Sequence, residues 1–424
     1  MIQKNISGKS WLNRNVFAFG LTSFLSDFGH EMATAVLPQF MQAIGASAAT
    51  LGLIEGSADA VSSLVKLGAG YRSDQIGQRK PWTVLGYFLT AIAKALFAFA
   101  FSWPLIMLGR VLGWLGRGIR GPLRDAMLAE SVAPELRGKA FGFHRASDTA
   151  GAVVGPLAAY GLLSLLAENP GLLRKIGEIM PFLAAPPGET FRLIFFLTLI
   201  PGILAVVSFA YLVTESKREA NQTLSMRLAF KGMPKEYRSF LIAVGLFGMA
   251  DFAPTLMMLR AATLLEPQMG AAAASRLTVL LYLWRNVVYA AASYPIGALS
   301  TKFPRGKYLA CGYGIGVITF LAFALPLSSK IWFALLFALA GVFIAWEDTI
   351  EGVAVRDYVG NELAGTAYGI LGTVNGVGDF ISSFLVGVFW SSLGPSWGFG
   401  YAAVVGAIGM VRMFRLPPAL TKIG

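Results

Sequence analysis

Cysteine and charged residues are scarce in this sequence. Cys311 is the only cysteine among 424 residues, so the chain cannot form an internal disulfide. Charged side chains make up 14% of the residues, whereas soluble domains contain about 25%. Hydrophobic residues make up 55%, and this composition indicates an integral membrane protein. The net charge of +12 therefore reflects lysine and arginine placed in loops, and we expect no nucleic-acid partner.

Motifs for nucleotide hydrolysis and for enzyme catalysis are missing as well. The sequence has no Walker-type phosphate loop, which argues against ATP-driven transport. A membrane enzyme would need a nucleophile–base pair or a metal cluster, and neither stands out around the two histidines, His30 and His144. We therefore expect neither an enzyme nor a bound cofactor.

Twelve apolar stretches are long enough to cross a bilayer, which needs about 20 residues in a helix. Turn-forming or charged residues separate them, as in "YRSDQIGQRK" and "TKFPRGK". We expect transmembrane helices at 15–42, 48–70, 81–101, 104–130, 140–166, 190–213, 238–264, 272–301, 306–327, 331–358, 365–392 and 396–416.

The basic residues predict the orientation in the membrane. With the N-terminus in the cytoplasm, Arg72, Arg79 and Lys139 fall in inner loops, and the outer loops around "QAIGASAAT" and "FSWP" carry no basic residue. We expect both termini to be cytoplasmic and the chain to lie in the plasma membrane. The outer loop 167–189 departs from the charge rule, and we expect its middle to form a short amphipathic surface helix.

The two halves of the sequence repeat in the same order. "FLSDFG" around Asp27 matches "GMADFA" around Asp251, and "GWLGRGIRGPLRD" aligns without gaps onto "AWEDTIEGVAVRD". Asp59 falls opposite Asn286. Such repeats are typical of transporters whose halves are related by an axis along the membrane normal. We expect an all-α membrane protein with a six-helix bundle at 1–213, a cytoplasmic linker at 214–237 and a second six-helix bundle at 238–424.

The loop "GYRSDQIGQRK" after the second expected span resembles the loop signature of the major facilitator superfamily. Its signature residues are Gly70, Asp74, Gly77, Arg79 and Lys80. Gly77 permits a tight turn. Asp74 can pair with nearby basic groups or a helix N-terminus, and breaking that contact would release one conformation. The second-half counterpart has Thr301 in place of the aspartate, so we expect the first-half latch to matter more.

Two further elements resemble the same superfamily. Arg110, followed by a glycine-rich run and by "P…RG", is similar to its fourth-helix arginine, and the resemblance implies a position near the coupling path. A second set resembles the fifth-helix signature of the superfamily's proton antiporters and consists of Gly142, Gly151, Gly155 and Pro156. These residues allow close packing and bending, and a glycine-rich packing face would give the same pattern.

The stretch "RVLGWLGRGIRGPLRD" places four arginines in an apolar segment: Arg110, Arg117, Arg120 and Arg124. A lipid-facing arginine at a helix centre costs about 2.5–3.5 kcal/mol. At about 100° per residue the four fall within an arc of about 80°, so one face can turn toward a watery cavity. The aligned second-half helix is acidic at Glu347, Asp348 and Glu351. The two faces form either opposite walls of a cavity or ion pairs between the halves. Arg124 with Asp125, and Arg356 with Asp357, are expected to belong to an intracellular gate.

Carboxylates inside the expected spans are candidates for proton coupling. Asp27 and Glu31 are four residues apart and share a helix face, with His30 close to Asp27. A carboxylate in a low dielectric can exchange protons near neutral pH. We expect coupling at Asp27, Glu31, Asp59 and Asp251. We expect a substrate cavity formed by His30, Arg110, Arg117, Arg120, Asp148, Arg285, Asn286, Glu347 and Glu351. A divalent-metal site at Asp27, His30 and Glu31 is the alternative interpretation.

These patterns predict a secondary transporter of the major facilitator type. We expect a monomer in the bilayer that binds a small-molecule substrate and protons and exports the solute by antiport. A proton-coupled uptake symporter for a small anion or a metal chelate is the alternative, suggested by the three arginines that follow Arg110.

We predict that Asp74→Asn leaves folding and membrane insertion intact but impairs switching between inward-facing and outward-facing states. The substitution removes the charge with which the loop holds one conformation. Transport by the purified variant in vesicles measures the effect. Normal transport by a well-expressed Asp74→Asn protein would contradict the latch assignment.

Overall fold

The computed structural model describes residues 11–75, 78–133, 136–215, 233–359 and 364–416. The side chains of residues 70–75, 137–138, 301, 356–357 and 364–366 lie outside this description. Within the described ranges every regular element is helical.

The helices of the first half are α1 (Arg14–Thr34), α2 (Leu37–Ala43), α3 (Ala48–Gln75), α4 (Lys80–Ala95), η1 (Leu96–Phe99), α5 (Trp103–Glu130), α6 (Arg137–Glu168), α7 (Pro170–Ile179), η3 (Pro181–Ala184), α8 (Glu189–Leu197) and α9 (Leu199–Leu212). Those of the second half are α11 (Lys235–Gly248), α12 (Pro254–Met269), α13 (Ala271–Leu299), η4 (Ser300–Lys302), α14 (Arg305–Ala324), α15 (Lys330–Tyr358), α16 (Ala364–Leu393) and α17 (Pro395–Phe414).

All twelve expected spans are helical, but three of them are not single helices as we had expected. The span 15–42 divides into α1 and α2, 190–213 into α8 and α9, and 238–264 into α11 and α12. Proline accounts for two of the breaks, because Pro38 and Pro254 stand in the first turns of α2 and α12. A proline there lacks the N–H that a continuous helix would need.

Seven helices within the described ranges are long and apolar enough to cross a membrane by length and composition alone. They correspond to the expected spans that contain α4, α6, α8 with α9, and α14 to α17. The other five expected spans are those of α1 with α2, α3, α5, α11 with α12, and α13. Charged side chains such as Asp27 of α1 and Arg117 of α5 lower the hydropathy of some of these spans. The break between α11 and α12 leaves those two helices with 14 and 16 residues.

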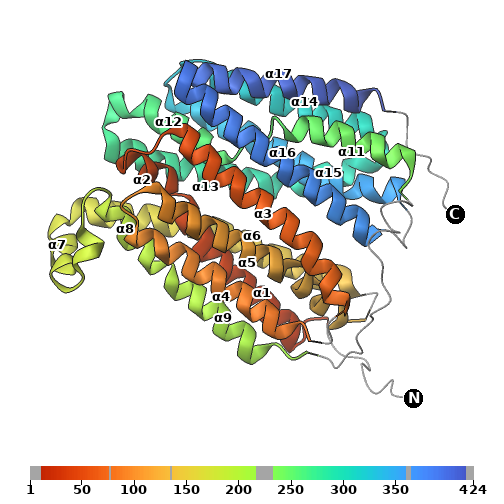
Figure 1. Cartoon of the computed structure of the whole chain (residues 1–424), viewed down its shortest axis with the longest axis horizontal. Coiled ribbons are helices and arrows are strands. Elements are labelled where there is room, and N and C mark those ends of the chain that lie inside the picture. The colour runs from red at the N-terminus through yellow and green to blue at the C-terminus, as the bar shows by residue number, and fades with distance from the viewer. Residues whose placement is uncertain (1–10, 76–77, 134–135, 216–232, 360–363, 417–424) are drawn as a thin grey trace.

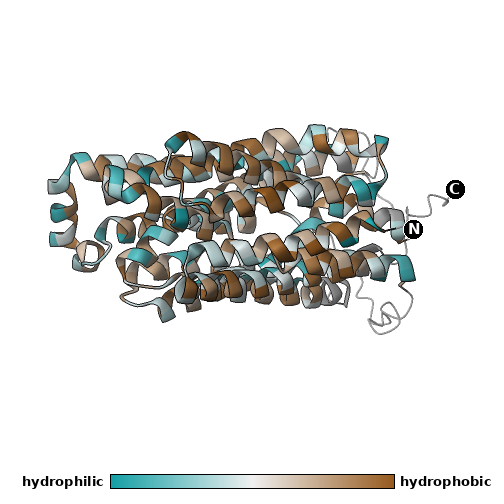
Figure 2. Cartoon of the chain, turned by 90° about the horizontal axis from the view of Figure 1, so that it is seen from above, coloured by the Kyte–Doolittle hydropathy of each residue, from teal (hydrophilic) through white to brown (hydrophobic). Residues whose placement is uncertain are grey.

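The long helices run side by side in two groups (Figure 1). In the first group α1 packs on α6 and α9, and α5 packs on α3 and α4. In the second, α14 packs on α15 and α17, and α13 packs on α12 and α15. The groups meet where α3 lies along α16 and α6 lies against α13. Hydrophobic residues predominate along the helices, and α1 begins at the same end of the molecule at which α17 ends (Figures 1 and 2).

The contact between α3 and α16 depends on small residues. Gly52 and Gly56 of α3 lie directly against the backbone of Ser383 and Phe380 in α16, so a Cβ atom at either glycine would overlap α16. Membrane helices associate through such small-xxx-small faces, which let two backbones approach closely. The two halves are therefore joined along this line by backbone packing.

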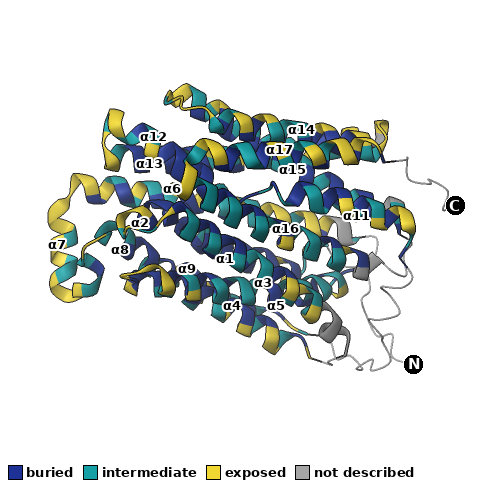
Figure 3. Ribbon diagram, turned by 45° about the horizontal axis from the view of Figure 1, so that its top comes forward, coloured by how far each residue is buried: buried dark blue, intermediate teal, exposed yellow. Residues whose placement is uncertain are grey.

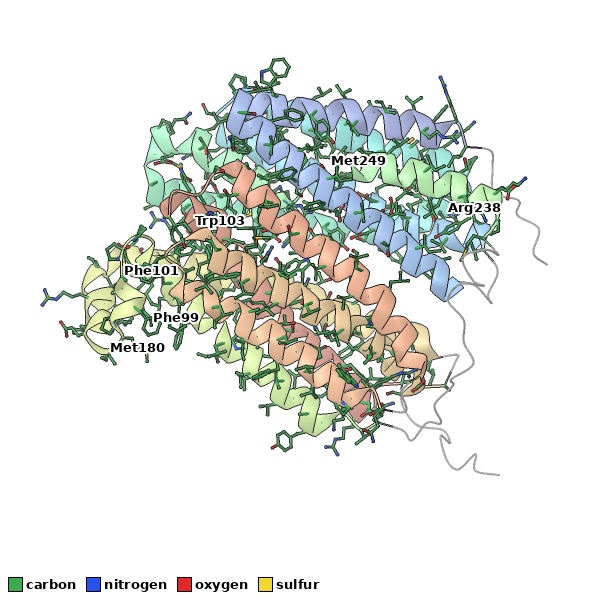
Figure 4. All side chains as sticks on the ribbon, in the orientation of Figure 1. Phe99, Phe101, Trp103, Met180, Arg238 and Met249 are labelled. Carbon is green, nitrogen blue, oxygen red and sulfur yellow. The ribbon has the colours of Figure 1, made fainter. Side chains whose placement is uncertain are left out.

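The amphipathic helix expected within 167–189 is present as α7, which has no buried residue and projects from one end of the molecule (Figure 3). Phe182, which follows it, stacks on Phe99 with ring centroids 4.6 Å apart. Phe99, Phe101 and Trp103 lie at this end, and Arg238 lies at the opposite end (Figure 4). Exposed aromatic rings at one end of a bundle are typical of residues at the membrane–water interface.

We predict that Gly56→Leu lowers the free energy of unfolding by about 1–3 kcal/mol, because the new side chain overpacks the contact with Phe380. Gly68→Leu is the matched control, since it lies on the same helix and a Cβ atom there meets nothing within 4 Å. Thermal unfolding in detergent compares the two variants. Equal melting temperatures would show that the α3–α16 contact does not need the glycine.

Candidate coupling and substrate site

A small polar cavity of about 90 Å³ lies in the interior of the molecule. Three carboxylates and one guanidinium line it: Asp59 of α3, Asp251 of the segment before α12, Asp379 of α16 and Arg285 of α13. The rest of the lining is mostly apolar and includes Phe252, Met257 and Phe343. Asp59 comes from the first half and the other three charged residues come from the second. The cavity therefore lies at the contact between the halves and is lined by more carboxyl groups than guanidinium groups.

The break between α11 and α12 explains why Asp251 reaches this cavity. Residues 249–253 are not helical, and Met249 at the start of the break lies near the middle of the second half (Figure 4). Ser383 of α16 holds the break, because its Oγ accepts a hydrogen bond from the Ala253 amide at 3.0 Å. Irregular backbone at membrane depth is tolerated where it is buried in protein or lines a cavity, which is the situation here.

Asp27 of α1 and Arg117 of α5 form an ion pair within the first half. Arg117 Nη2 donates to Asp27 Oδ1 at 2.7 Å, and Arg120 Nη2 lies 3.9 Å from the same oxygen. Beside this pair, Ser23 donates its hydroxyl to Asp148 at 2.7 Å, and the Asp148 carboxyl faces that of Asp27. The side chain of Arg117 is 27% exposed, which makes it the most accessible of the four arginines in α5.

Arg110 is buried and paired with Glu55 of α3. Its Nη2 and Nε donate to Glu55 Oε2 at 2.6 and 3.0 Å, and Nη1 donates to Thr34 at 3.3 Å. The guanidinium also lies 4.0 Å from the centre of the Trp114 ring, which is a cation–π contact. The Trp114 indole donates to Asp59 at 2.5 Å and so connects this pair to the edge of the central cavity.

The four arginines do not share one watery face, which departs from the expectation drawn from their arc. Arg110 and Arg120 have exposed fractions of 4% and 3% and line none of the described cavities. Arg120 lies over the Tyr87 ring at 4.3 Å, and Arg124 pairs with its neighbour Asp125 at 2.9 Å. Carboxylates and aromatic rings of the same half occupy the helix face that carries these arginines.

Of the acidic residues of α15, Glu351 forms its hydrogen bonds within its own half. Glu351 accepts hydrogen bonds from the Tyr313 hydroxyl at 2.5 Å and from Asn375 at 2.7 Å. Glu347 is 6% exposed, and its Oε2 has no hydrogen-bond partner among the described residues. Neither glutamate pairs with Arg117, whose partner is Asp27. The described ion pairs of the basic face are therefore made within the first half, whereas Glu351 is held by neutral groups of the second half.

Hydrogen bonds to α13 join the two halves. The Tyr282 hydroxyl donates to Glu31 Oε2 at 2.7 Å, and Asn286 donates to the Ala152 carbonyl at 3.4 Å. One turn further along, Arg145 of α6 donates to the Tyr289 hydroxyl at 2.5 Å. That hydroxyl in turn donates to Asp348 at 3.0 Å. Arg285 donates to Asn286 at 3.1 Å from the same helix.

The two tyrosines of this network were missed in the sequence. Tyr282, Asn286 and Tyr289 are spaced four and three residues apart, which is the repeat of one helix face. That spacing of polar hydroxyl and amide groups in an apolar span was the available signal. Asp379 carried a visible signal too, because it is a carboxylate in the middle of an expected span.

His30 is buried against the Trp114 ring, with ring centroids 4.7 Å apart. Its Nδ1 has no hydrogen-bond partner among the described residues. In the part of the chain that the structure describes, no group of three or more His, Cys, Asp and Glu residues is arranged to hold a metal ion. The geometry around His30 thus gives no support to the alternative metal site with Asp27 and Glu31.

The expected latch is described only in part. Gly77 lies outside the described residues. For Gly70, Asp74, Arg356 and Asp357 the structure describes the helical backbone but not the side-chain positions. Arg79 is described, and its Nη1 donates to Glu130 at 2.7 Å. Glu215 caps the start of α4, because its carboxylate accepts the amides of Arg79 and Lys80 at 2.5 and 3.0 Å. A carboxylate at a helix N-terminus is stabilising.

Two glycines of the fifth expected span, Gly151 and Gly155, are packing residues in this structure. Gly151 lies against the backbone of Phe24 and Phe28, and Gly155 lies against that of Phe28 and Met32. Pro156 follows inside α6. A Cβ atom at Gly142 would meet nothing within 4 Å. These contacts fix α6 against α1 and so hold Asp148 beside Asp27.

Known proteins resemble this chain over most of its length. A family model described as Major Facilitator Superfamily matches residues 19–275 and 240–423. An uncharacterized MFS-type transporter of Methanocaldococcus jannaschii is 33% identical over 417 residues, which are 97% of this chain and 98% of the relative. The quinolone resistance protein NorA of Staphylococcus aureus is 24% identical over 171 residues, 40% of this chain and 41% of that protein. The crystal structure of the nucleoside transporter NupG has a TM-score of 0.72 at 14% identity, and the match covers 96% of this chain and 100% of that one.

We predict that Arg110→Met destabilises the protein by about 3–5 kcal/mol, because it leaves the Glu55 carboxylate buried without its partner. The double variant Arg110→Met with Glu55→Met should recover most of the loss, since no uncompensated charge then remains. Thermal unfolding of the purified single and double variants measures both effects. A double variant no more stable than Arg110→Met would contradict the assignment of the pair.

Proposed function

This chain belongs to the major facilitator superfamily, and we propose that it is a proton-coupled secondary transporter that exports a small solute by antiport. The protein is a multi-pass membrane transporter with two six-helix bundles related by a pseudo-twofold axis along the membrane normal. We place the bundles at 1–213 and 238–424, joined by the linker 214–237, with both termini in the cytoplasm of a plasma-membrane protein. We further propose that it works as a monomer and is not an enzyme.

The ion pair of Asp27 and Arg117 is the observation that carries the proposal. It lies in the middle of α1 and α5, and Arg117 is partly exposed while the Asp27 side chain is 10% exposed. A proton on Asp27 would neutralise the carboxylate and free the guanidinium, so protonation changes the charge balance of the first half. Asp148 faces Asp27 and offers a second carboxyl group to the same proton.

The lining of the central cavity favours a solute that carries a cationic group. Its lining carries three carboxylates against one guanidinium, which favours positive charge when the carboxylates are ionised. Protons and a cationic solute would compete for Asp59, Asp251 and Asp379, and competition for one set of sites is the simplest basis of antiport. At about 90 Å³ the cavity is smaller than the roughly 300–1,000 Å³ of ligand sites, so the halves must separate to admit a solute.

The bonds between the halves can respond to the same protons. Glu31 accepts a hydrogen bond from Tyr282 across the contact, and an ionised carboxylate is the stronger acceptor. Protonation of Glu31 would weaken this link and favour movement of one bundle against the other. Alternating access in this class of fold is largely such rigid-body rocking around a fixed central site.

An uptake symporter for a small anion is the second candidate. It is favoured by the partial exposure of Arg117 and by Arg285 in the cavity lining. Arg117 could bind an anion once Asp27 is protonated, and Arg285 could bind one once the carboxylates of the cavity lining are protonated. Proton and anion would then bind together, which gives symport.

We predict that Asp27→Asn abolishes transport driven by a pH gradient but leaves solute exchange at equal pH, because the variant cannot exchange the proton. Purified protein in vesicles, with the fluorescent cation ethidium as the solute, measures both. Glu236→Gln, an exposed carboxylate at the start of α11, is the control and should transport normally.

Gradient-driven ethidium transport that survives in Asp27→Asn would move the coupling to another carboxylate. A wild-type protein that ignores ethidium but takes up a small anion together with protons would contradict export and favour the symporter.

A further inference from the structure

A second and much larger cavity lies between the halves at the end of the molecule where α7 projects (Figure 1). Its volume is about 610 Å³, within the roughly 300–1,000 Å³ of small-molecule sites. The first half contributes α2, α6 and the start of α8, and the second half contributes α12 and α13. It shares no lining residue with the central cavity. A ligand here would contact both halves without entering the coupling site.

Two buried polar side chains in this lining lack partners. Gln39 of α2 is 6% exposed, and neither its Nε2 nor its Oε1 has a hydrogen-bond partner among the described residues. Ser275 of α13 is 7% exposed, and its hydroxyl is likewise without a partner there. A buried polar group that lacks a hydrogen bond costs about 1–3 kcal/mol. The two side chains come from opposite halves, and their polar atoms are covered in this structure. A rotation of each side chain toward the cavity would let one molecule with hydrogen-bonding groups satisfy both.

The charges of the lining select the sign of the ligand. Glu189 at the start of α8 and Glu266 of α12 contribute two carboxylates, and Arg276 of α13 contributes one positive charge. Glu266 accepts a hydrogen bond from Gln42 of α2 at 3.1 Å, so this carboxylate already links the two halves. The net charge of the lining is one negative, which favours a cation over an anion.

We propose that this outer cavity binds an organic cation with a protonated amine at one end and a hydroxyl or amide at the other. The ammonium lies with Glu189 and Glu266, and the polar end hydrogen-bonds with Gln39 and Ser275. Because the ligand bridges α2 and α8 to α12 and α13, it stabilises the arrangement in which α2 and α12 are in contact. The site bridges the two halves at the end that the proposed orientation places outside the cell, and its binding does not depend on which solute the centre carries.

Three four-carbon probes separate the contributions of the ligand's two ends. 4-Aminobutan-1-ol carries both the ammonium and the hydroxyl, butylamine lacks the hydroxyl, and butane-1,4-diol lacks the charge. Their binding to the purified full-length protein in nanodiscs is measured by thermal shift at constant ionic strength, because a ligand of the native state raises its apparent stability. We expect the amino alcohol to bind most tightly, in the millimolar range typical of such small molecules, and the diol to bind weakest.

Glu266→Gln should weaken binding of the amino alcohol about tenfold or more, since it removes a charged hydrogen-bond partner. Gln39→Leu should reduce the advantage of the amino alcohol over butylamine, while the melting temperature of the free variant shows that it folds. Glu178→Gln is the matched control, because this exposed carboxylate of α7 pairs with Arg174 outside the cavity lining. Asp27→Asn should bind the amino alcohol as the wild type does.

Equal shifts with all three probes, or no shift with the amino alcohol, would overturn the proposed site. An unchanged affinity in Glu266→Gln would also overturn it, because the amine would then be bound elsewhere. Loss of proton coupling in Asp27→Asn with retained binding of the amino alcohol separates this inference from the proposed transport function.

Discussion

Unpaired charge is expensive inside a membrane, and the arrangement of this molecule follows from that constraint. The described ion pairs of Arg110 and Arg117 are made with carboxylates of the same half. The buried Glu351 is likewise held by Tyr313 and Asn375 of its own half. Each bundle therefore satisfies these charges by itself, and a movement that separates the bundles leaves the pairs intact.

The described contacts that join the two bundles are not ion pairs. The α3–α16 line rests on glycines against backbone, and the contacts of α13 with the first half are hydrogen bonds through Tyr282, Asn286 and Tyr289. A hydrogen bond between neutral groups, such as that of Asn286, contributes about 0.5–1.5 kcal/mol, and one to a charged group, such as that of Tyr282 to Glu31, about 1.5–3 kcal/mol. Breaking a buried ion pair costs about 3–5 kcal/mol. Each of these hydrogen bonds between the halves is consequently weaker than a buried ion pair within a half. A transporter that rocks one bundle against the other needs bonds between the bundles that break more easily than the ion pairs within them.

The sequence was sufficient for the fold because hydropathy, charge placement and the internal repeat are local or periodic signals. Helices occur in all twelve expected spans. The helix breaks that the sequence analysis did not predict lie at Thr198 and just before the first-turn prolines Pro38 and Pro254. The site was less predictable because partners are chosen in three dimensions. A helical arc could place Arg110 and Arg117 on one face, but it could not say that Glu55 and Asp27 fill that face.

The two cavities show which site residues could be recognised in the sequence and which could not. Asp59, Asp251 and Arg285 of the central cavity were accessible to sequence reasoning, because a charged residue in an apolar span stands out. Gln39 and Ser275 of the outer cavity did not stand out, since one amide and one hydroxyl are common in helices and only burial without a partner distinguishes them. The cost of burial also differs, because an unpaired charge is more expensive to bury than an unpaired amide or hydroxyl. Protonation or ion binding at the central residues would change a full charge, whereas the outer pair needs only a bound molecule that supplies two hydrogen bonds. The two cavities share no lining residue, so a ligand in the larger one would leave the carboxylates of the central one uncontacted.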